Sequence, residues 1–334
     1  MNHSALLLPA LLGLVLLVPT PQAKSADATP ELETLTVQGE QPGPGLWALQ
    51  HGDHRLWVLA TVSPLPKGLT WRSRQLERVM AGTQVVIAPP KVEVEVSDIG
   101  FLEGLSTIRL ALKIGRLPDK QRLVDVMPAP LHARWASLRQ RYAPRDDALE
   151  SRRPFFAGIG LYDKALARAG LDRDRDVWDD VRKLAKRQKV PLREPQIRLP
   201  LSDPKGLLGE FINTPVAADL PCFEALLPLM ESQLPQLQKR GLAWASGDID
   251  VLKQQAPDDL DAVCLNVFTG TPRLAALYQE GLRRWRLEWV LAAEGALLRN
   301  TASLAVLPLE EVTGPQGLVA QMVQRGYTLV DPQH

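Results

Sequence analysis

A short apolar segment, residues 56–62 (LWVLATV), ends abruptly at Ser63-Pro64 and constrains the fold more than any other feature. Its length and nearly uninterrupted hydrophobicity predict a strand buried inside a sheet. The preceding LWALQ and the turn residues Gly52-Asp53 indicate that this strand is the second half of a β-hairpin. In open α/β sheets, ligands and chemistry lie beyond the carboxyl ends of the strands. Ser63 therefore stands where a functional side chain is expected.

The rest of the chain predicts a mixed α/β (α+β) fold. Beyond the hairpin, a helix is predicted over residues 72–82, short strands over 84–90, 303–309 and 327–330, and a helix over 314–326. Apolar residues spaced three and four apart predict a helical middle section over residues 128–300, whose longest helix starts at Thr271-Pro272. The N- and C-terminal segments should thus form one sheet within a single domain, residues 44–334.

The N-terminal segment has the pattern of an export signal. Residues 5–18 are apolar, and small residues suited to cleavage follow them, so we expect a signal peptide over 1–28 that is cleaved between residues 23 and 28. An uncleaved anchor is the alternative. Residues 29–43 are polar and rich in Pro and Gly, and predict a flexible leader. The mature protein is expected to be periplasmic or extracellular.

Two cysteines, Cys222 and Cys264, are the only ones in the chain. In an exported protein an even number of thiols favours pairing, so we predict a disulfide. The alternative is two buried, reduced side chains that act as small apolar residues.

Charge and motifs exclude several functions. The net charge of +1 gives no reason to expect nucleic acid or an anionic membrane as a partner, and beyond the signal segment no run of 18 apolar residues occurs. His51 and His54 have a spacing that a metal could use, but they flank a hairpin turn where polar residues are common. Ser63 has no histidine nearby in sequence to act as a base, which favours a turn residue over a nucleophile.

Two stretches resemble the TraB/GumN family, relatives of the Tiki metalloproteases. The opening GLWALQHGDHRLWVLATVSPLPKGLTW…LERVMAGTQVVIAPP is similar to the family's hairpin, GTxH motif, helix and strand ending in Glu. The closing LRNTASLAVLPLEE…GPQGLVAQMVQRGYTLV is similar to its strand, GxxH motif, helix and final strand. Between them, GLAWASGD (241–248) and the two cysteines resemble features of bacterial GumN-like members.

The resemblance also shows what this chain lacks. In metal-dependent relatives, the two motif histidines and the glutamate build the metal site at neighbouring strand ends. The positions that correspond to the motif glycines, histidines and glutamate are here Ala60, Ser63, Pro89, Leu307, and Glu310 or Glu311. Divalent first-row metals need three or four imidazole, carboxylate or thiolate ligands, and this set offers at most one or two glutamates. We therefore predict neither a bound metal nor any other cofactor.

These observations favour an exported TraB/GumN-like protein that keeps the scaffold and has a binding or assembly role, with an unknown protein or peptide as its ligand. One alternative is a metal-dependent, peptidase-like hydrolase with a site rebuilt around Glu310 and Glu311. A second alternative is a structural protein of the cell envelope. On this interpretation the chain is not an enzyme, and it contacts neither nucleic acid nor, apart from the signal segment, a membrane.

The signal peptide leads to a direct prediction. N-terminal sequencing of exported protein should find a mature terminus between residues 24 and 29, because the apolar segment is followed there by small residues. Recovery of chains that start at Met1 from the membrane fraction would instead establish the uncleaved anchor.

Overall fold

The structure is a computed structural model that describes residues 43–96, 101–254 and 260–332. The chain divides into two units, Met1–Glu40 and Gln41–His334, and every described residue belongs to the second. The predicted signal peptide and nearly all of the predicted leader lie outside the described residues.

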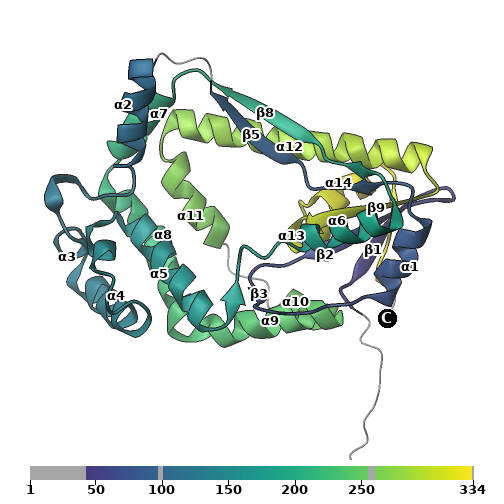
Figure 1. Cartoon of the computed structure of the whole chain (residues 1–334), viewed down its shortest axis with the longest axis horizontal. Coiled ribbons are helices and arrows are strands. Elements are labelled where there is room, and N and C mark those ends of the chain that lie inside the picture. Colours follow the sequence, from purple (N-terminus) through teal and green to yellow (C-terminus); the bar gives the residue numbers. More distant parts are fainter. Residues whose placement is uncertain (1–42, 97–100, 255–259, 333–334) are drawn as a thin grey trace, which may run out of the picture. The chain divides into compact units, whose positions relative to one another are not determined.

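The described strands and helices are numbered in chain order, and Figure 1 labels those for which there is room. The strands are β1 (Leu46–His51), β2 (His54–Thr61), β3 (Leu65–Pro66), β4 (Val86–Ile87), β5 (Lys91–Val96), β6 (Leu171–Asp172), β7 (Leu192–Arg193), β8 (Gln196–Leu201), β9 (Ala302–Pro308) and β10 (Thr328–Val330). The α-helices are α1 (Arg74–Gly82), α2 (Phe101–Ala111), α3 (Leu123–Val126), α4 (Ala129–Tyr142), α5 (Pro154–Arg168), α6 (Val177–Gln188), α7 (Pro204–Ile212), α8 (Leu220–Pro228), α9 (Leu234–Ser246), α10 (Ile249–Gln254), α11 (Leu260–Thr269), α12 (Pro272–Arg299), α13 (Leu309–Thr313) and α14 (Leu318–Gln324). The mixed α/β class is therefore confirmed.

One mixed sheet joins the two ends of the chain. Its strand order is β10–β1–β2–β9–β4–β7, and β1 runs antiparallel to β10 and β2, whereas β2, β9, β4 and β7 run parallel. The predicted hairpin is present, with His51 opposite His54 and Gly52 in the left-handed region at φ +61°. Glycine adopts that conformation without steric cost, which explains its place in the turn.

The centre of the sheet is apolar on both faces, as expected for parallel strands covered by helices. The pairing of β2 with β9 runs from Arg55↔Ala302 to Thr61↔Pro308, and most side chains between these ends are buried. The long helix α12 contacts both strands. It starts as predicted, with Thr271 as its N-cap and Pro272 in its first turn, and its Trp289 is buried in the core of the sheet.

A second apolar core lies within the helical region and contains buried side chains of α4, α5 and α8. Cys222 of α8 and Cys264 of α11 are at disulfide distance there, with Cα atoms 4.5 Å apart, in agreement with the predicted pairing. No helix among the described residues is long and apolar enough to cross a membrane.

The middle section differs from the prediction because it is not wholly helical and its helices begin before residue 128, with α2 and α3. Its short strands β6, β7 and β8 pair with β3, β4 and β5, which come from the first part of the chain. Two of these strands have only two residues each, so they carry no alternation of apolar and polar residues that a sequence could reveal.

A buried ion pair crosses the helical core. Arg153, at the start of α5, donates to both carboxylate oxygens of Asp219, with Nη2–Oδ1 at 2.6 Å and Nε–Oδ2 at 3.1 Å. Both side chains are almost completely buried. The guanidinium also donates to the Thr214 carbonyl, and the Phe155 N–H donates to Asp219. Burial of both charges is tolerable only because these partners satisfy them.

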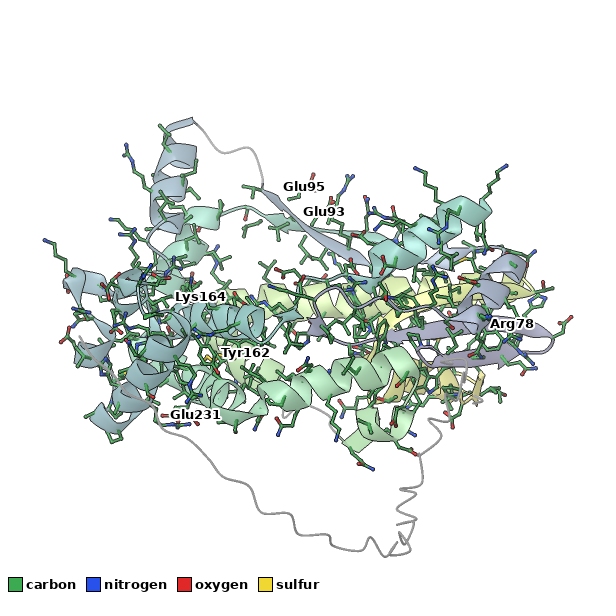
Figure 2. The ribbon with its side chains drawn as sticks, turned by 60° about the horizontal axis from the view of Figure 1, so that its bottom comes forward. Arg78, Glu93, Glu95, Tyr162, Lys164 and Glu231 are labelled. Carbon is green, nitrogen blue, oxygen red and sulfur yellow. A yellow bond between two sulfur atoms is a disulfide. The ribbon has the colours of Figure 1, made fainter. Side chains whose placement is uncertain are left out.

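Replacement of Asp219→Asn should therefore lower the free energy of unfolding by about 3–5 kcal/mol, because it leaves a buried guanidinium without its counter-charge. Urea unfolding of the purified protein measures this. The matched control is Glu231→Gln, which breaks the partly exposed pair of Glu231 with Arg134 and should cost less than about 1 kcal/mol (Glu231 is labelled in Figure 2). Equal losses in the two variants would contradict a special role for the buried pair.

Candidate functional site

The carboxyl ends of β2 and β9 meet at one edge of the sheet, which we call the rim. Thr61 lies opposite Pro308, and Ser63 and Glu310 each follow two residues later, where the Arg240 side chain contacts both residues. Within the strands, Ala60 lies opposite Leu307, so the two residues at the family's motif glycine positions are neighbours. These four positions come from opposite ends of the sequence.

The third strand of the rim is β4, which is parallel to β9 on the side away from β2. Ile87 lies opposite Ala305, and Pro89 follows two residues after this pair. The end of this segment is bound to α12, because the Trp285 indole N–H donates to the Pro90 carbonyl at 2.8 Å. The sheet therefore brings the sequence-predicted positions to a single edge, although Pro89 has no ligating side chain.

Ser63 uses its hydroxyl for a structural contact. Its Oγ donates to the Arg173 carbonyl at 3.1 Å, and the peptide bond to Pro64 is cis. His54 lies at the opposite end of β2, where its Nδ1 donates to the Leu297 carbonyl. The Ser63 hydroxyl therefore connects the turn after β2 to the segment around Arg173.

The two adjacent glutamates have different environments. Glu311 is 17% exposed, pairs with Arg286 at 2.8 Å and accepts the Leu318 N–H at the start of α14 at 2.9 Å. It therefore ties α12, α13 and α14 together. Glu310 is 60% exposed and faces the rim. Of the two glutamates, only Glu310 pairs with Arg240, the side chain that also contacts the Ser63 carbonyl.

A side chain from α9 occupies the rim between these residues. Arg240 is only 5% exposed, and its Nη2 lies 3.0 Å from Glu310 Oε1 while its Nη1 lies 3.5 Å from the Ser63 carbonyl oxygen. One turn further along α9, the Trp244 indole N–H donates to the Ala60 carbonyl at 2.7 Å. Residues four apart share one face of a helix, so both side chains contact the end of β2.

Gly241 makes this close approach possible. A Cβ atom at this position would lie 2.6 Å from Pro66 Cδ, which is closer than packed atoms can come. The segment GLAWASGD resembles the family, but the sequence does not predict the contacts of Arg240 and Trp244 with the end of β2. The signal that the sequence contains is a basic residue and a tryptophan four apart on one helix, with a glycine between them.

The residues of the rim do not fit a divalent metal. Ser63 contributes a hydroxyl that donates to a carbonyl, Pro89 contributes no ligand, and the Glu310 carboxylate already pairs with a guanidinium. In the part of the chain that the structure describes, no three His, Cys, Asp or Glu side chains are arranged to hold a metal ion. The buried guanidinium of Arg240, 3.0 Å from the Glu310 carboxylate, would also repel a divalent ion.

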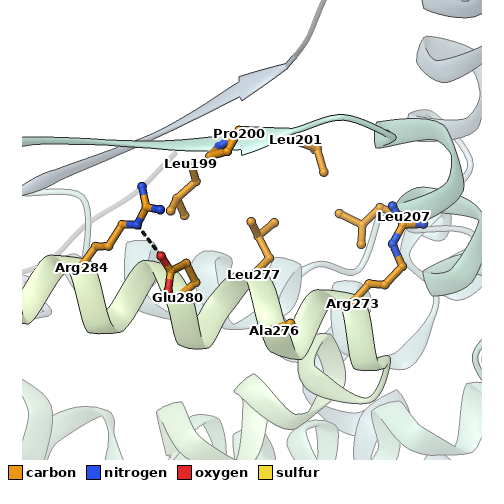
Figure 3. A pocket seen from close by; sticks show the side chains of 9 residues that line it. All are labelled: Leu199, Pro200, Leu201, Leu207, Arg273, Ala276, Leu277, Glu280 and Arg284. Atoms are coloured by element: carbon orange, nitrogen blue, oxygen red, sulfur yellow. Dashed lines mark hydrogen bonds and ion pairs between the residues drawn. The ribbon is translucent and has the colours of Figure 1, made fainter.

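Two open hollows occur elsewhere on the described surface. One, of about 300 Å³, lies between β8, α7 and α12, and Figure 3 shows its leucine side chains with Arg273, Glu280 and Arg284 at its edges. The other, of about 540 Å³, follows α9 and includes Lys239 and Asp248. Neither contains Ser63, Pro89 or Glu310, so neither is part of the rim.

Residues 45–330 match the TraB/PrgY/gumN family, so the chain belongs to this family over both the sheet and the helical region. No curated protein and no solved structure matches the chain.

The two buried tryptophans, Trp244 and Trp289, provide a test of the hydrogen bond from α9 to β2. Trp244→Phe should lower the free energy of unfolding by about 1–3 kcal/mol more than Trp289→Phe, because it leaves the buried Ala60 carbonyl without its donor. The indole N–H of Trp289 is buried and has no hydrogen-bond partner among the described residues, so this control changes the volume alone. Denaturant unfolding measures both variants, and equal losses would show that the indole hydrogen bond contributes nothing.

Proposed function

We propose that this protein is an exported member of the TraB/PrgY/gumN family that binds a protein or peptide ligand and does not catalyse metal-dependent hydrolysis. The observation that carries this proposal is the Arg240 guanidinium at the rim, between the Glu310 carboxylate and the Ser63 carbonyl. A cation of the protein itself thus neutralises the carboxylate that a metal would need.

The chemistry of the rim suits binding better than catalysis. Hydrolysis of a peptide needs an activated water or a nucleophile with a base, and a metal would activate water only if three protein ligands held it. The rim instead presents the exposed Glu310 carboxylate, in α13 directly after β9, and the exposed Ser63, directly after β2. A carboxylate in this position can accept hydrogen bonds from a basic side chain or a peptide amine.

Export and domain organisation are part of the proposal. The disulfide-distance pair of Cys222 and Cys264 supports an oxidising compartment, since disulfides persist outside the cytosol. We further propose that residues 44–334 act as one functional domain after removal of the signal peptide. The family match over residues 45–330 supports this extent, because it covers both apolar cores.

Elemental analysis of mature protein purified without chelators tests the first half of the proposal. Zinc, manganese and cobalt should be substoichiometric, and added metal should produce no hydrolysis of a peptide library, because the donor set is incomplete. Glu310→Ala should change neither result, like the control Glu95→Ala on a distant exposed strand. One tightly bound metal per chain that is lost in Glu310→Ala alone would contradict the proposal and favour the rebuilt hydrolase.

A crosslinking experiment tests the second half of the proposal and distinguishes a binding protein from a purely structural one. A photoreactive residue at Ser63, at the rim, should crosslink one defined protein or peptide in intact cells. The same group at Asp53, at the opposite end of β2, is the matched control and should not. Equal labelling from both positions, or none from either, would favour the structural envelope role.

A further inference from the structure

A separate two-stranded ribbon leaves one strand edge open. β5 pairs in parallel with β8 and with no other strand in the described part of the chain. β8 lies against α12 (Figure 1), whereas β5 is exposed along nearly its whole length. Parallel strands are usually covered on both sides, and exposed edges are usually blocked. This open strand therefore needs an explanation.

The backbone geometry shows which groups the edge offers. The Lys91 N–H donates to the Pro195 carbonyl at 2.9 Å, so Lys91 and the residues two and four further on direct their backbone groups toward β8. The alternate residues, Val92, Val94 and Val96, direct their N–H and C=O groups outward. The edge thus presents a row of backbone donors and acceptors to an incoming strand.

The side chains of β5 divide into an apolar and a charged face. Val92, Val94 and Val96 are 42%, 50% and 46% exposed, and they share a face with Ile197 and Leu199, which are buried. The opposite face carries Lys91, Glu93 and Glu95, two of which Figure 2 labels. An incoming strand would have to match both faces.

We propose that β5 pairs with β5 of a second copy of this chain, as an antiparallel edge related by a two-fold axis through Glu93. In this register Val92 of one copy lies opposite Val94 of the other, and Lys91 lies opposite Glu95. The two valine pairs are the hydrogen-bonded pairs, because their backbone groups face outward. The Lys91–Glu95 pairs are then the closely spaced pairs, where opposite charges attract most.

The neighbouring registers are less favourable. A shift that places Val94 opposite itself sets Glu93 against Glu95 twice, and like charges directly opposite destabilise a sheet. A shift that places Val92 opposite itself pairs only residues 91–93 of β5 and gives one valine pair instead of two. The register through Glu93 pairs residues 91–95 of both copies, gives two valine pairs and sets Lys91 opposite Glu95 at both ends.

The chosen register has one unfavourable contact, which makes it testable. Glu93 meets its own copy on the axis. The Lys91 ammonium hydrogen-bonds to Glu93 at 3.0 Å and lowers the pKa of this carboxyl, so both copies are charged at neutral pH. Removal of this charge should therefore strengthen the contact, which no purely structural role of Glu93 predicts.

Sedimentation velocity of the purified protein over a concentration range tests the pairing. The protein should dimerise, Lys91→Glu and Glu95→Lys should each weaken the dimer roughly tenfold or more, and the double variant should restore it. Glu93→Gln should tighten it. Val94→Pro removes only an outward N–H and should abolish the dimer, whereas the control Val94→Thr keeps that N–H and should not.

Disulfide crosslinking checks the register independently. Cysteines introduced as Glu93→Cys would face each other across the axis with Cα atoms about 4.5 Å apart, within disulfide range, so mild oxidation should give a covalent dimer. Those introduced as Glu95→Cys would be separated by four residues, about 13 Å, and should not crosslink. This control keeps the test valid even where Val94→Pro does not fold.

Two results would overturn the proposal. The first is a protein that stays monomeric at every concentration and gives no crosslink from position 93. The second is a dimer that neither the charge variants nor Val94→Pro weakens, which would place the contact on another surface. Neither result bears on the metal content of the rim, so the proposed function is tested separately.

Discussion

The parallel pairing of β2 with β9 is the contact on which the rest of the structure depends. It joins Arg55–Thr61 to Ala302–Pro308, and it therefore closes a loop that contains the whole chain between these two strands. Closing so long a loop costs conformational entropy, which the burial of apolar side chains on both faces of the two strands offsets. Once the pair is formed, the carboxyl ends of both strands point to the same edge, and the rim follows.

The helices refine this edge in different ways. α12 leads directly into β9 and supports the end of the β4 segment through Trp285, and Glu311 ties it to α13 and α14. α9 supplies the side chains that contact the end of β2, namely Arg240 and Trp244. The helical core is stabilised separately, by the buried pair of Arg153 and Asp219 and by the disulfide-distance cysteines. The rim thus rests on rigid elements from four parts of the sequence.

The rim contains an ion pair between Arg240 and Glu310. A metal site concentrates negative or neutral donors around an external cation, whereas this rim contains its own cation on a fixed helix. The Glu310 side chain stays 60% exposed although it lies 3.0 Å from the guanidinium. This arrangement leaves an accessible carboxylate on a scaffold shared with the family. A separate open edge at β5 would let the same domain assemble without covering the rim.

The amino-acid sequence alone was sufficient for the features that local pattern encodes. The hairpin at Gly52-Asp53, the strands 56–62 and 303–309, the cap of α12 at Thr271 and the cysteine pairing all followed from residue type and spacing. The family resemblance placed Ser63, Pro89 and the glutamate pair near one another, but it could not separate Glu310 from Glu311 or find Arg240. The roles of Glu310 and Arg240 depend on contacts between α9, β2 and α13. These elements are far apart in the chain, so their contacts produce no repeating pattern in the sequence. For the same reason the short strands β7 and β8 were missed, because tertiary pairing rather than local propensity holds two to six residues in a strand.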